Sequence, residues 1–141
     1  MECGDGLTLS CLLDTHVLLW WLATGERLSR AAASAIQAAD TVLLSPLTFW
    51  EAATLTRLGR VELDRELSVW VQDVLRQPRI TLAPLSAEAA AWAGNLGQNF
   101  PGDPIDRLLY ATSRDLRVPL ISKDDGLRAF AATTGEVEIV W

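Results

Sequence analysis

The chain has 141 residues, of which 50% are hydrophobic and 21% are charged. This balance excludes a disordered protein, and the length suits one domain, which we expect over residues 1–141. The formal net charge of −6 excludes binding of nucleic acid through a broad basic surface. It does not exclude a nucleic-acid enzyme whose acidic site is bridged to phosphate by a metal ion.

Targeting signals and membrane segments are not expected. The residues after Met1 are not basic, which argues against a secretory signal. The apolar run from Val17 to Ala23 is too short to cross a bilayer. The two cysteines, Cys3 and Cys11, indicate a reduced, cytoplasmic protein. One histidine and two cysteines cannot form a structural zinc site.

The first expected element is a strand from Leu7 to Leu13 that leads directly into Asp14. A short apolar run bounded by polar residues is typical of a strand buried on both faces of a parallel sheet. A helix is expected from Thr15 to Ala23, so Asp14 lies where a strand gives way to a helix. Ligands bind at such strand ends in open α/β sheets. The alternative role for Asp14 is an N-cap of the helix.

The remaining elements alternate in the same way. We expect helices at Ser29–Ala39, Pro46–Leu58, Arg65–Arg76, Ser86–Leu96, Asp103–Leu116 and Asp124–Ala132, with strands at Thr41–Ser45, Arg79–Ala83, Val118–Ser122 and Val137–Val140. Five strands alternating with helices predict an α/β fold, with a mostly parallel five-stranded sheet and helices on both faces.

Glu51 lies within the helix expected after Pro46. The stripe of this helix that faces the core is expected to consist of Leu47, Trp50, Thr54, Leu55 and Leu58. Glu51 projects from the same broad face. A lone buried carboxylate costs several kcal/mol unless it is paired or bound to a cation. Glu51 is therefore expected either to pair with a buried arginine or to serve as a metal ligand or acid/base group.

Two further acidic positions begin helices. Asp103 is expected as an N-cap, and Asp106 occupies the third helical position, where the helix dipole alone favours an acid. Asp124 and Asp125 follow a strand through Ser122. One of these two residues is expected to cap the helix and the other to point at the crevice.

These carboxylates are expected at one edge of the parallel sheet, because strands end or helices begin beside each of them. Three or four carboxylates that converge repel one another. The usual resolution is a hard divalent cation with oxygen ligands, which indicates Mg²⁺ or Mn²⁺.

Taken together, the motifs of the chain resemble those of the PIN-domain ribonucleases, and specifically those of the VapC-type toxins of bacterial toxin–antitoxin pairs. Each motif alone is weak evidence, but four of them occur in the right order over nearly the whole chain. The matching segments are Leu12–His16 with Leu18–Trp21, Ser45–Glu51 continuing to Arg60, Gly102–Leu109, and Leu120–Asp124.

The resemblance implies a PIN (Rossmann-like) fold and a metal-binding set made of Asp14, Glu51, Asp106 and Asp124. Spacing from Ser122 favours Asp124 over Asp125 as the fourth acid. The resemblance also implies a polar residue near the first metal. The supporting residues expected around the site are Thr15, Ser122, Asp103 and Asp125.

The activity implied is hydrolysis of RNA phosphodiester bonds with Mg²⁺ or Mn²⁺, in which a bound water becomes the attacking hydroxide. The implied partners are an RNA substrate, a second copy of the chain in a homodimer, and a small antitoxin with a basic segment; no membrane is expected. Arg27, Arg30 and Arg107 are candidate RNA contacts. His16 is expected to pack locally, and Trp20 to lie in the core or in a dimer interface.

Three alternatives follow from the same residues. Many relatives carry histidine where this chain has Pro101, which leaves open a PIN fold that only binds RNA or a partner. A receiver-like phospho-accepting domain needs an acidic pair after the first strand, where only Asp14 stands. Nucleotide-binding enzymes are disfavoured because neither a glycine-rich dinucleotide motif nor a P-loop is present.

Overall fold

The computed structural model describes residues 9–141, so Leu7 and Thr8 of the first expected strand, and Cys3, lie outside the described residues. Its core is a five-stranded sheet of order β3-β2-β1-β4-β5, in which every pairing is parallel. The expected α/β fold is confirmed. The strands are β1 (Ser10–Leu13), β2 (Thr41–Leu44), β3 (Ile80–Leu82), β4 (Leu120–Ile121) and β5 (Ile139–Val140).

Seven helices are present in this part of the chain, and serine or aspartate caps begin most of them as expected. Ser29, Ser45 and Ser86 each accept a backbone N–H of the helix that follows. The helices are α1 (Thr15–Leu22), α2 (Arg30–Ala38), α3 (Pro46–Arg57), α4 (Leu67–Leu75), α5 (Ala87–Gly94), α6 (Pro104–Leu116) and α7 (Asp125–Thr134). None of the helices described is long and apolar enough to cross a membrane.

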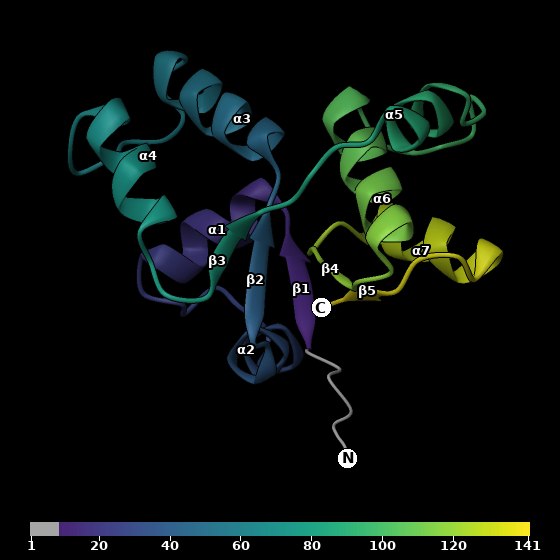
Figure 1. The fold of residues 1–141 in the computed structure, drawn as a ribbon, viewed down its shortest axis with the longest axis horizontal. Helices are drawn as coiled ribbons and strands as arrows, with labels where there is room; N and C mark the ends of the chain where they lie inside the picture. The colour runs from purple at the N-terminus through teal and green to yellow at the C-terminus, as the bar shows by residue number, and fades with distance from the viewer. Residues whose placement is uncertain (1–8) are drawn as a thin grey trace.

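Helices pack on both faces of the sheet, since α1 to α4 contribute to the cluster around Cys11 and Leu13, and α6 to the cluster around Leu12. In Figure 1, α3 and α4 lie to the left of β1, and α5, α6 and α7 lie to its right. Alternate residues of β1 serve the two faces. Cys11 and Leu13 pack with α1 and α2, whereas Leu12 packs with Leu109 of α6. Cys11 is a free cysteine, and burial raises the pKa of its thiol to about 11. Its thiol is therefore unreactive, and the side chain serves to pack the core.

The chain order reverses between β1 and β4, because β2 and β3 extend the sheet to one side and β4 and β5 to the other. Such a switch point opens a crevice at the carboxyl ends of the two strands. Leu13 pairs with Ile121, and the backbone N–H of Asp14 donates to the carbonyl of Ile121 at 3.2 Å. The residues after β1 and after β4 are therefore neighbours at this edge.

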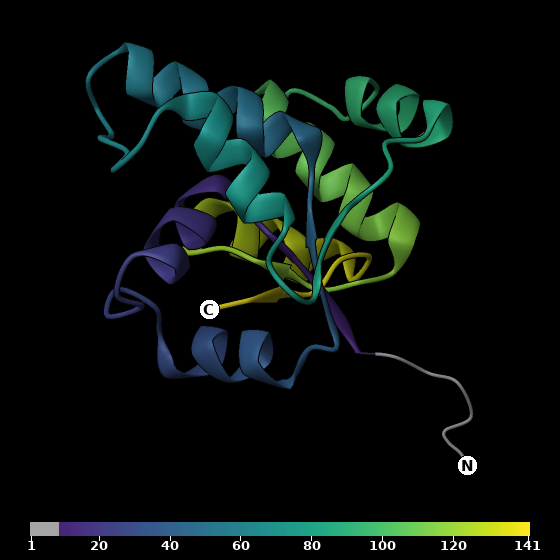
Figure 2. The ribbon, with the colours of Figure 1, turned by 60° about the vertical axis from the view of Figure 1, so that its left-hand side comes forward.

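The predicted inward stripe of α3 is wrong. Trp50 and Leu58 are 60% and 53% exposed, and the buried residues of α3 are Thr48 and Ala52. The reason is that α3 packs over α1 and not flat along the sheet. Figure 2 shows α3 above α1, and α2 below α1. Only a narrow face of α3 therefore meets the core, and that face carries small residues.

Candidate active site

Asp14 lies at the switch point and caps α1. Its carboxylate accepts the backbone N–H of Val17 at 2.9 Å and a hydrogen bond from the side chain of Ser122. Ser122 is fully buried, and its hydroxyl also accepts the backbone N–H of Asp124 at 3.2 Å. The capping role considered for Asp14 is therefore real, and it holds the carboxylate at the crevice.

Glu51 reaches the same region from α3. The hydroxyl of Thr15, a buried residue, donates a hydrogen bond to Oε1 of Glu51. Because Thr15 follows Asp14 directly, this bond ties Glu51 to the start of α1. Of the two roles considered for Glu51, pairing with a buried arginine does not occur among residues 9–141.

Asp106 belongs to a capping box at the start of α6. Its side chain accepts the N–H of Asp103 at 3.1 Å, while Asp103 accepts the N–H of Asp106 at 2.9 Å. Gly102 makes this arrangement possible. A Cβ at Gly102 would lie 2.8 Å from Phe100 Cε2 and 2.9 Å from Asp106 Oδ2, closer than real Cβ contacts come.

Asp124 caps α7 by accepting the N–H of Leu127 at 2.9 Å. Asp125 points away, with its side chain 87% exposed and paired with Arg128. A Cβ at Gly126 would lie 3.2 Å from Asp124 Oδ1 and 3.4 Å from Pro101 Cβ. The loop that carries Pro101 therefore packs against the start of α7 and brings α6 towards Asp124.

The carboxyl groups influence one another in two pairs. Burial raises the pKa of Asp14, and the nearby charge of Glu51 raises it further, against the hydrogen bonds from Ser122 and Val17. Burial also raises the pKa of Asp106 to about 7, with further upward contributions from the Asp103 and Asp124 carboxylates. Asp14 thus interacts with Glu51, and Asp106 with Asp124.

A divalent cation suits this donor set. Ion pairs between described residues involve other carboxylates, so none neutralises Asp14, Glu51, Asp106 or Asp124. Oxygen-only donors match the preference of Mg²⁺, and two of these carboxylates, Asp14 and Asp106, are half-buried with raised pKa values. The side chains do not form a closed shell: over residues 9–141, no three Asp, Glu, His or Cys side chains gather closely enough to hold a metal ion.

The three arginines expected to contact RNA have different surroundings. Arg107 donates to the backbone carbonyls of Ala93, Leu96 and Gly97, so its guanidinium holds the end of α5. This structural role was not foreseen from the sequence. Arg27 and Arg30 are both exposed.

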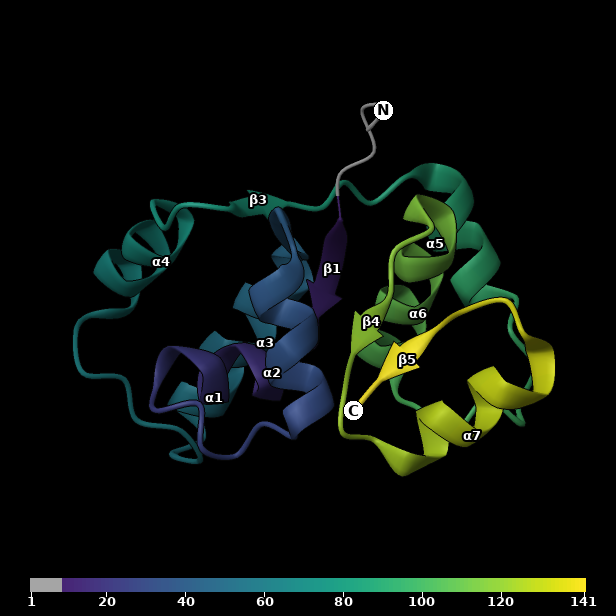
Figure 3. The ribbon, with the colours of Figure 1, turned by 90° about the horizontal axis from the view of Figure 1, so that it is seen from below.

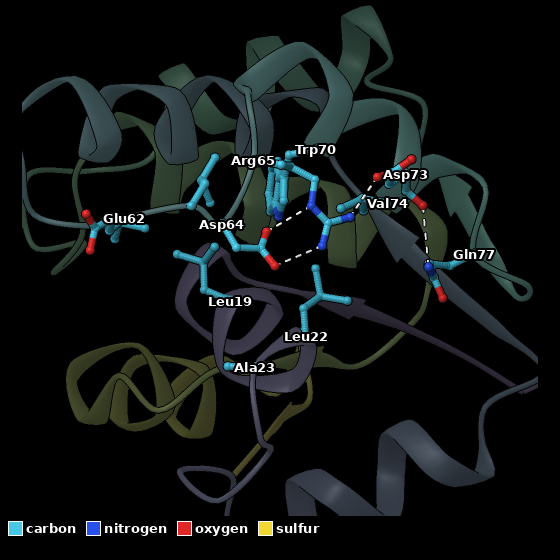
Figure 4. A pocket seen from close by; sticks show the side chains of 12 residues that line it. Leu19, Leu22, Ala23, Glu62, Asp64, Arg65, Trp70, Asp73, Val74 and Gln77 are labelled. Carbon is cyan, nitrogen blue, oxygen red and sulfur yellow. Dashed lines mark hydrogen bonds and ion pairs between the residues drawn. The ribbon is translucent and has the colours of Figure 1, made fainter.

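A pocket of about 470 Å³ lies between α1, α4 and the segment before α4, away from the four acids. Figure 4 shows Arg65 at its centre, held by Asp64 and Asp73. Arg65 pairs with both carboxylates, and Asp73 also pairs with Arg76, so the charged groups at the centre of this pocket are engaged in ion pairs. The pocket contains none of the four acids that the sequence motifs single out. The switch point is therefore the better candidate for chemistry.

Sequence reasoning missed two contributors to this edge. Gly102 was treated only as part of a motif, although its missing side chain admits Asp106. Lys123 was passed over, although it stands between Ser122 and Asp124 and its ammonium group lies 5.8 Å from the ring centre of Trp20. The signal available for Lys123 was its position in the strand-to-helix turn that carries the fourth acid.

Comparisons with known proteins place the chain in a class. The PIN domain family matches residues 11–133. The chain is 38% identical over 118 residues to Ribonuclease VapC22 of Mycobacterium tuberculosis, covering 84% of this chain and 89% of that protein.

Solved structures show the same fold at low identity. VapBC-1 of nontypeable Haemophilus influenzae superposes with a TM-score of 0.65 at 12% identity, over 93% of this chain and 96% of that one. VapBC2 of Rickettsia felis, bound to a DNA fragment from its promoter, gives 0.63 at 10% identity over 93% and 97%. A toxin–antitoxin complex from Klebsiella pneumoniae gives 0.59 at 19% identity over 90% and 94%.

The protein therefore belongs to the PIN-domain family, and the resemblance noted in its sequence is confirmed. Within that family it is related to the VapC ribonuclease toxins, whose structures share its fold.

Proposed function

We propose that this protein is a metal-dependent endoribonuclease of the VapC type, acting as the toxin of a toxin–antitoxin pair in the cytoplasm. Its relation to a ribonuclease at 38% identity supports the activity. The observation that carries the site assignment is Asp14, a half-buried carboxylate at the switch point that is hydrogen-bonded to the buried Ser122 and faces the charge of Glu51.

We assign Mg²⁺ binding to Asp14, Glu51, Asp106 and Asp124, with Mn²⁺ as a substitute. When bound, the ion supplies a Lewis acid for a phosphate oxygen and lowers the pKa of a coordinated water. Ser122 and the N–H of Val17 orient the Asp14 carboxylate. The backbone N–H groups of Asp103 and Leu127 orient Asp106 and Asp124 in the same way.

Glu51 is our candidate for the group that takes a proton from the attacking water. Thr15 donates to its Oε1. No described residue hydrogen-bonds to its Oε2, which is left for a water or a cation. A carboxylate fixed through one oxygen and free at the other can accept a proton at a defined position.

The partners we propose are an RNA substrate, a second copy of the chain, and a small antitoxin that presents a basic segment to the acidic crevice. The net charge of −6 favours a basic partner electrostatically. Solved relatives of this fold include toxin–antitoxin complexes, and this supports an antitoxin partner.

RNA cleavage with controlled metal content tests the proposal. The purified protein should cleave single-stranded RNA in Mg²⁺ or Mn²⁺, EDTA should stop it, and Asp14→Asn should abolish it while the protein stays folded. Expression of the wild type alone should slow bacterial growth, and Asp14→Asn should relieve the effect. Cleavage that persists in EDTA would contradict the metal-dependent mechanism.

A PIN fold that only binds RNA or a partner is the second candidate, because Pro101 stands where the sequence resemblance leads us to expect histidine in many members of the family. It predicts RNA binding without cleavage at any concentration of Mg²⁺ or Mn²⁺. A Pro101→His variant distinguishes the nuclease from the binding-only protein. If the variant cleaves RNA and the natural chain does not, the natural chain is the inactive alternative.

A further inference from the structure

A cationic aromatic cluster lies beside the acidic edge, centred on Trp20 of α1. The guanidinium carbon of Arg27 is 5.7 Å from the ring centre of Trp20, and the ammonium group of Lys123 is 5.8 Å from it. The rings of His16 and Trp141 lie 5.8 and 5.9 Å from the same indole. We call these five residues the Trp20 cluster.

The two cations of the Trp20 cluster are available for a ligand. Arg27 and Lys123 are both exposed, and neither takes part in an ion pair between described residues. By contrast, Arg65 and Arg114 each have a carboxylate partner. Attraction to the indole face favours positions over the ring for both cations while leaving their charge uncompensated.

The position of the cluster connects it to the candidate active site. Lys123 lies between Ser122 and Asp124 in the turn from β4 to α7, and His16 follows Asp14 by two residues. Figure 3 shows this turn next to the end of β5, where Ser122 donates its N–H to Val140. A chain bound at the acidic edge and running along α1 would pass over Lys123 first and Arg27 later.

We propose that Arg27 and Lys123, held on the Trp20 indole, bind backbone phosphates of single-stranded RNA next to the phosphate that is cleaved. This inference rests on the proposed ribonuclease function and names the path of its substrate. An acidic edge repels a polyanion, so adjacent uncompensated cations are needed to hold the flanking phosphates. Both cations lie within 6 Å of the centre of one indole, so they are within the span of a few nucleotides of each other.

The aromatic members favour a single strand over a duplex. Proteins that bind single-stranded nucleic acid combine a cationic track with rings on which bases stack. His16 is exposed and Trp20 is half-buried, so an unpaired base can approach the rings. In a duplex the bases stack on one another and are not free to do so.

Binding of a fluorescent single-stranded RNA of roughly 12 nucleotides to Asp14→Asn protein, with Mg²⁺ and over a range of salt concentrations, tests the path. Arg27→Gln and Lys123→Gln should each lower the affinity about fivefold, and each should reduce the slope of log K against log salt by about 0.7. Arg117→Gln is the matched control, because Arg117 is exposed but precedes β4 at the opposite edge. It should change neither quantity.

The possible results separate this inference from the proposed function. If wild type cleaves RNA but both glutamine variants keep parental affinity and slope, the phosphate path is wrong while the nuclease stands. If wild type does not cleave but both variants lose affinity and slope, the path stands and the nuclease fails. An oligoglutamate peptide that competes as well as RNA, through the same two residues, would overturn the assignment to RNA.

Discussion

The two carboxylate pairs at the switch point are held in different ways. Asp14 and Glu51, the α1–α3 pair, are connected through side chains: Thr15 donates to Glu51, and Ser122 hydrogen-bonds to Asp14. Asp106 and Asp124, which we call the α6–α7 pair, are held by backbone N–H groups at two helix starts.

This difference predicts which substitutions should disturb the geometry of each pair. Asp14 caps α1 as the other two acids cap or begin their helices, but it also accepts from Ser122, and its partner Glu51 accepts from the buried hydroxyl of Thr15. The α1–α3 pair therefore depends on two particular side chains in addition to the backbone. The α6–α7 pair depends on the path of the backbone, because its acids sit at helix N-termini and Gly102 must leave room for one of them. Substitutions that separate these two dependences test the comparison.

The largest effect is expected for Asp14→Asn. The variant keeps the shape of the side chain and removes the charge that a metal needs, so cleavage should fall by more than the roughly 10–100-fold that loss of a supporting residue costs. Since burial already disfavours the charged form, the metal-free variant should melt no lower than wild type. Rates and thermal melts in EDTA measure both. A variant that cleaves normally would remove Asp14 from the site.

Gly102→Ala should break the α6–α7 pair while leaving every carboxylate in place. The new Cβ would press on Phe100 and Asp106, so the capping box distorts at a cost of about 1 kcal/mol. The stabilisation of the protein by Mg²⁺ in thermal melts should shrink. Gly94→Ala is the control, because nothing lies within 4 Å of a Cβ there and the position is helical. Equal Mg²⁺ responses in the two variants would disprove the role of Gly102.

Thr15→Val should loosen the α1–α3 pair by removing the hydrogen bond to Glu51. Metal affinity should fall by about 10–100-fold, the usual cost of losing a supporting hydrogen bond at a metal site. Thr15→Ser keeps the hydroxyl and should stay near wild type. Titration calorimetry with Mn²⁺ gives the affinities, and identical affinities for the valine and serine variants would show that the hydroxyl is not needed.

The stability of the metal-free protein should depend on pH through Asp106, a member of the α6–α7 pair. Its pKa is about 7 in the folded protein against a usual 3.8, so the folded state binds more protons than the unfolded state between these values. Stability of the metal-free protein should therefore be greatest below the unfolded pKa and fall as pH rises through about 7.

Asp106→Asn should remove this fall. One pKa unit is about 1.4 kcal/mol, and screening at a partly exposed group reduces it. Above the folded pKa, the variant should melt roughly 2–4 °C higher than wild type in EDTA. Melts at several pH values measure this, and parallel pH profiles for the two proteins would exclude the raised pKa.

The smallest effect is expected for Asp125→Asn. Its exposed ion pair with Arg128 contributes about 0–1 kcal/mol, so melting temperature, cleavage and the Mg²⁺ response should stay close to wild type. Asp124→Asn, one residue away, should lose cleavage and the Mg²⁺ response. The reverse pattern would assign the fourth acidic position to Asp125.

Much of the fold was accessible from the sequence because its signals are local. Ser29, Ser45 and Ser86 mark helix starts through hydrogen bonds to residues two or three positions on. Short apolar runs likewise predict the strands, because burial on both faces of the sheet requires consecutive apolar residues. The α3 stripe failed because periodicity alone does not say which neighbour a helix meets, and α3 packs over α1 with a narrow face.

The sequence by itself determined that acids follow strand ends or lie in helix starts, since this depends only on the order of residues. Tertiary structure alone decided which acids face one another. The strand order puts β4 beside β1, so Ser122 meets Asp14, and the packing of α3 on α1 brings Glu51 to Thr15. These contacts join residues 36 or more positions apart, and no local hydrogen bond or periodicity encodes such pairings.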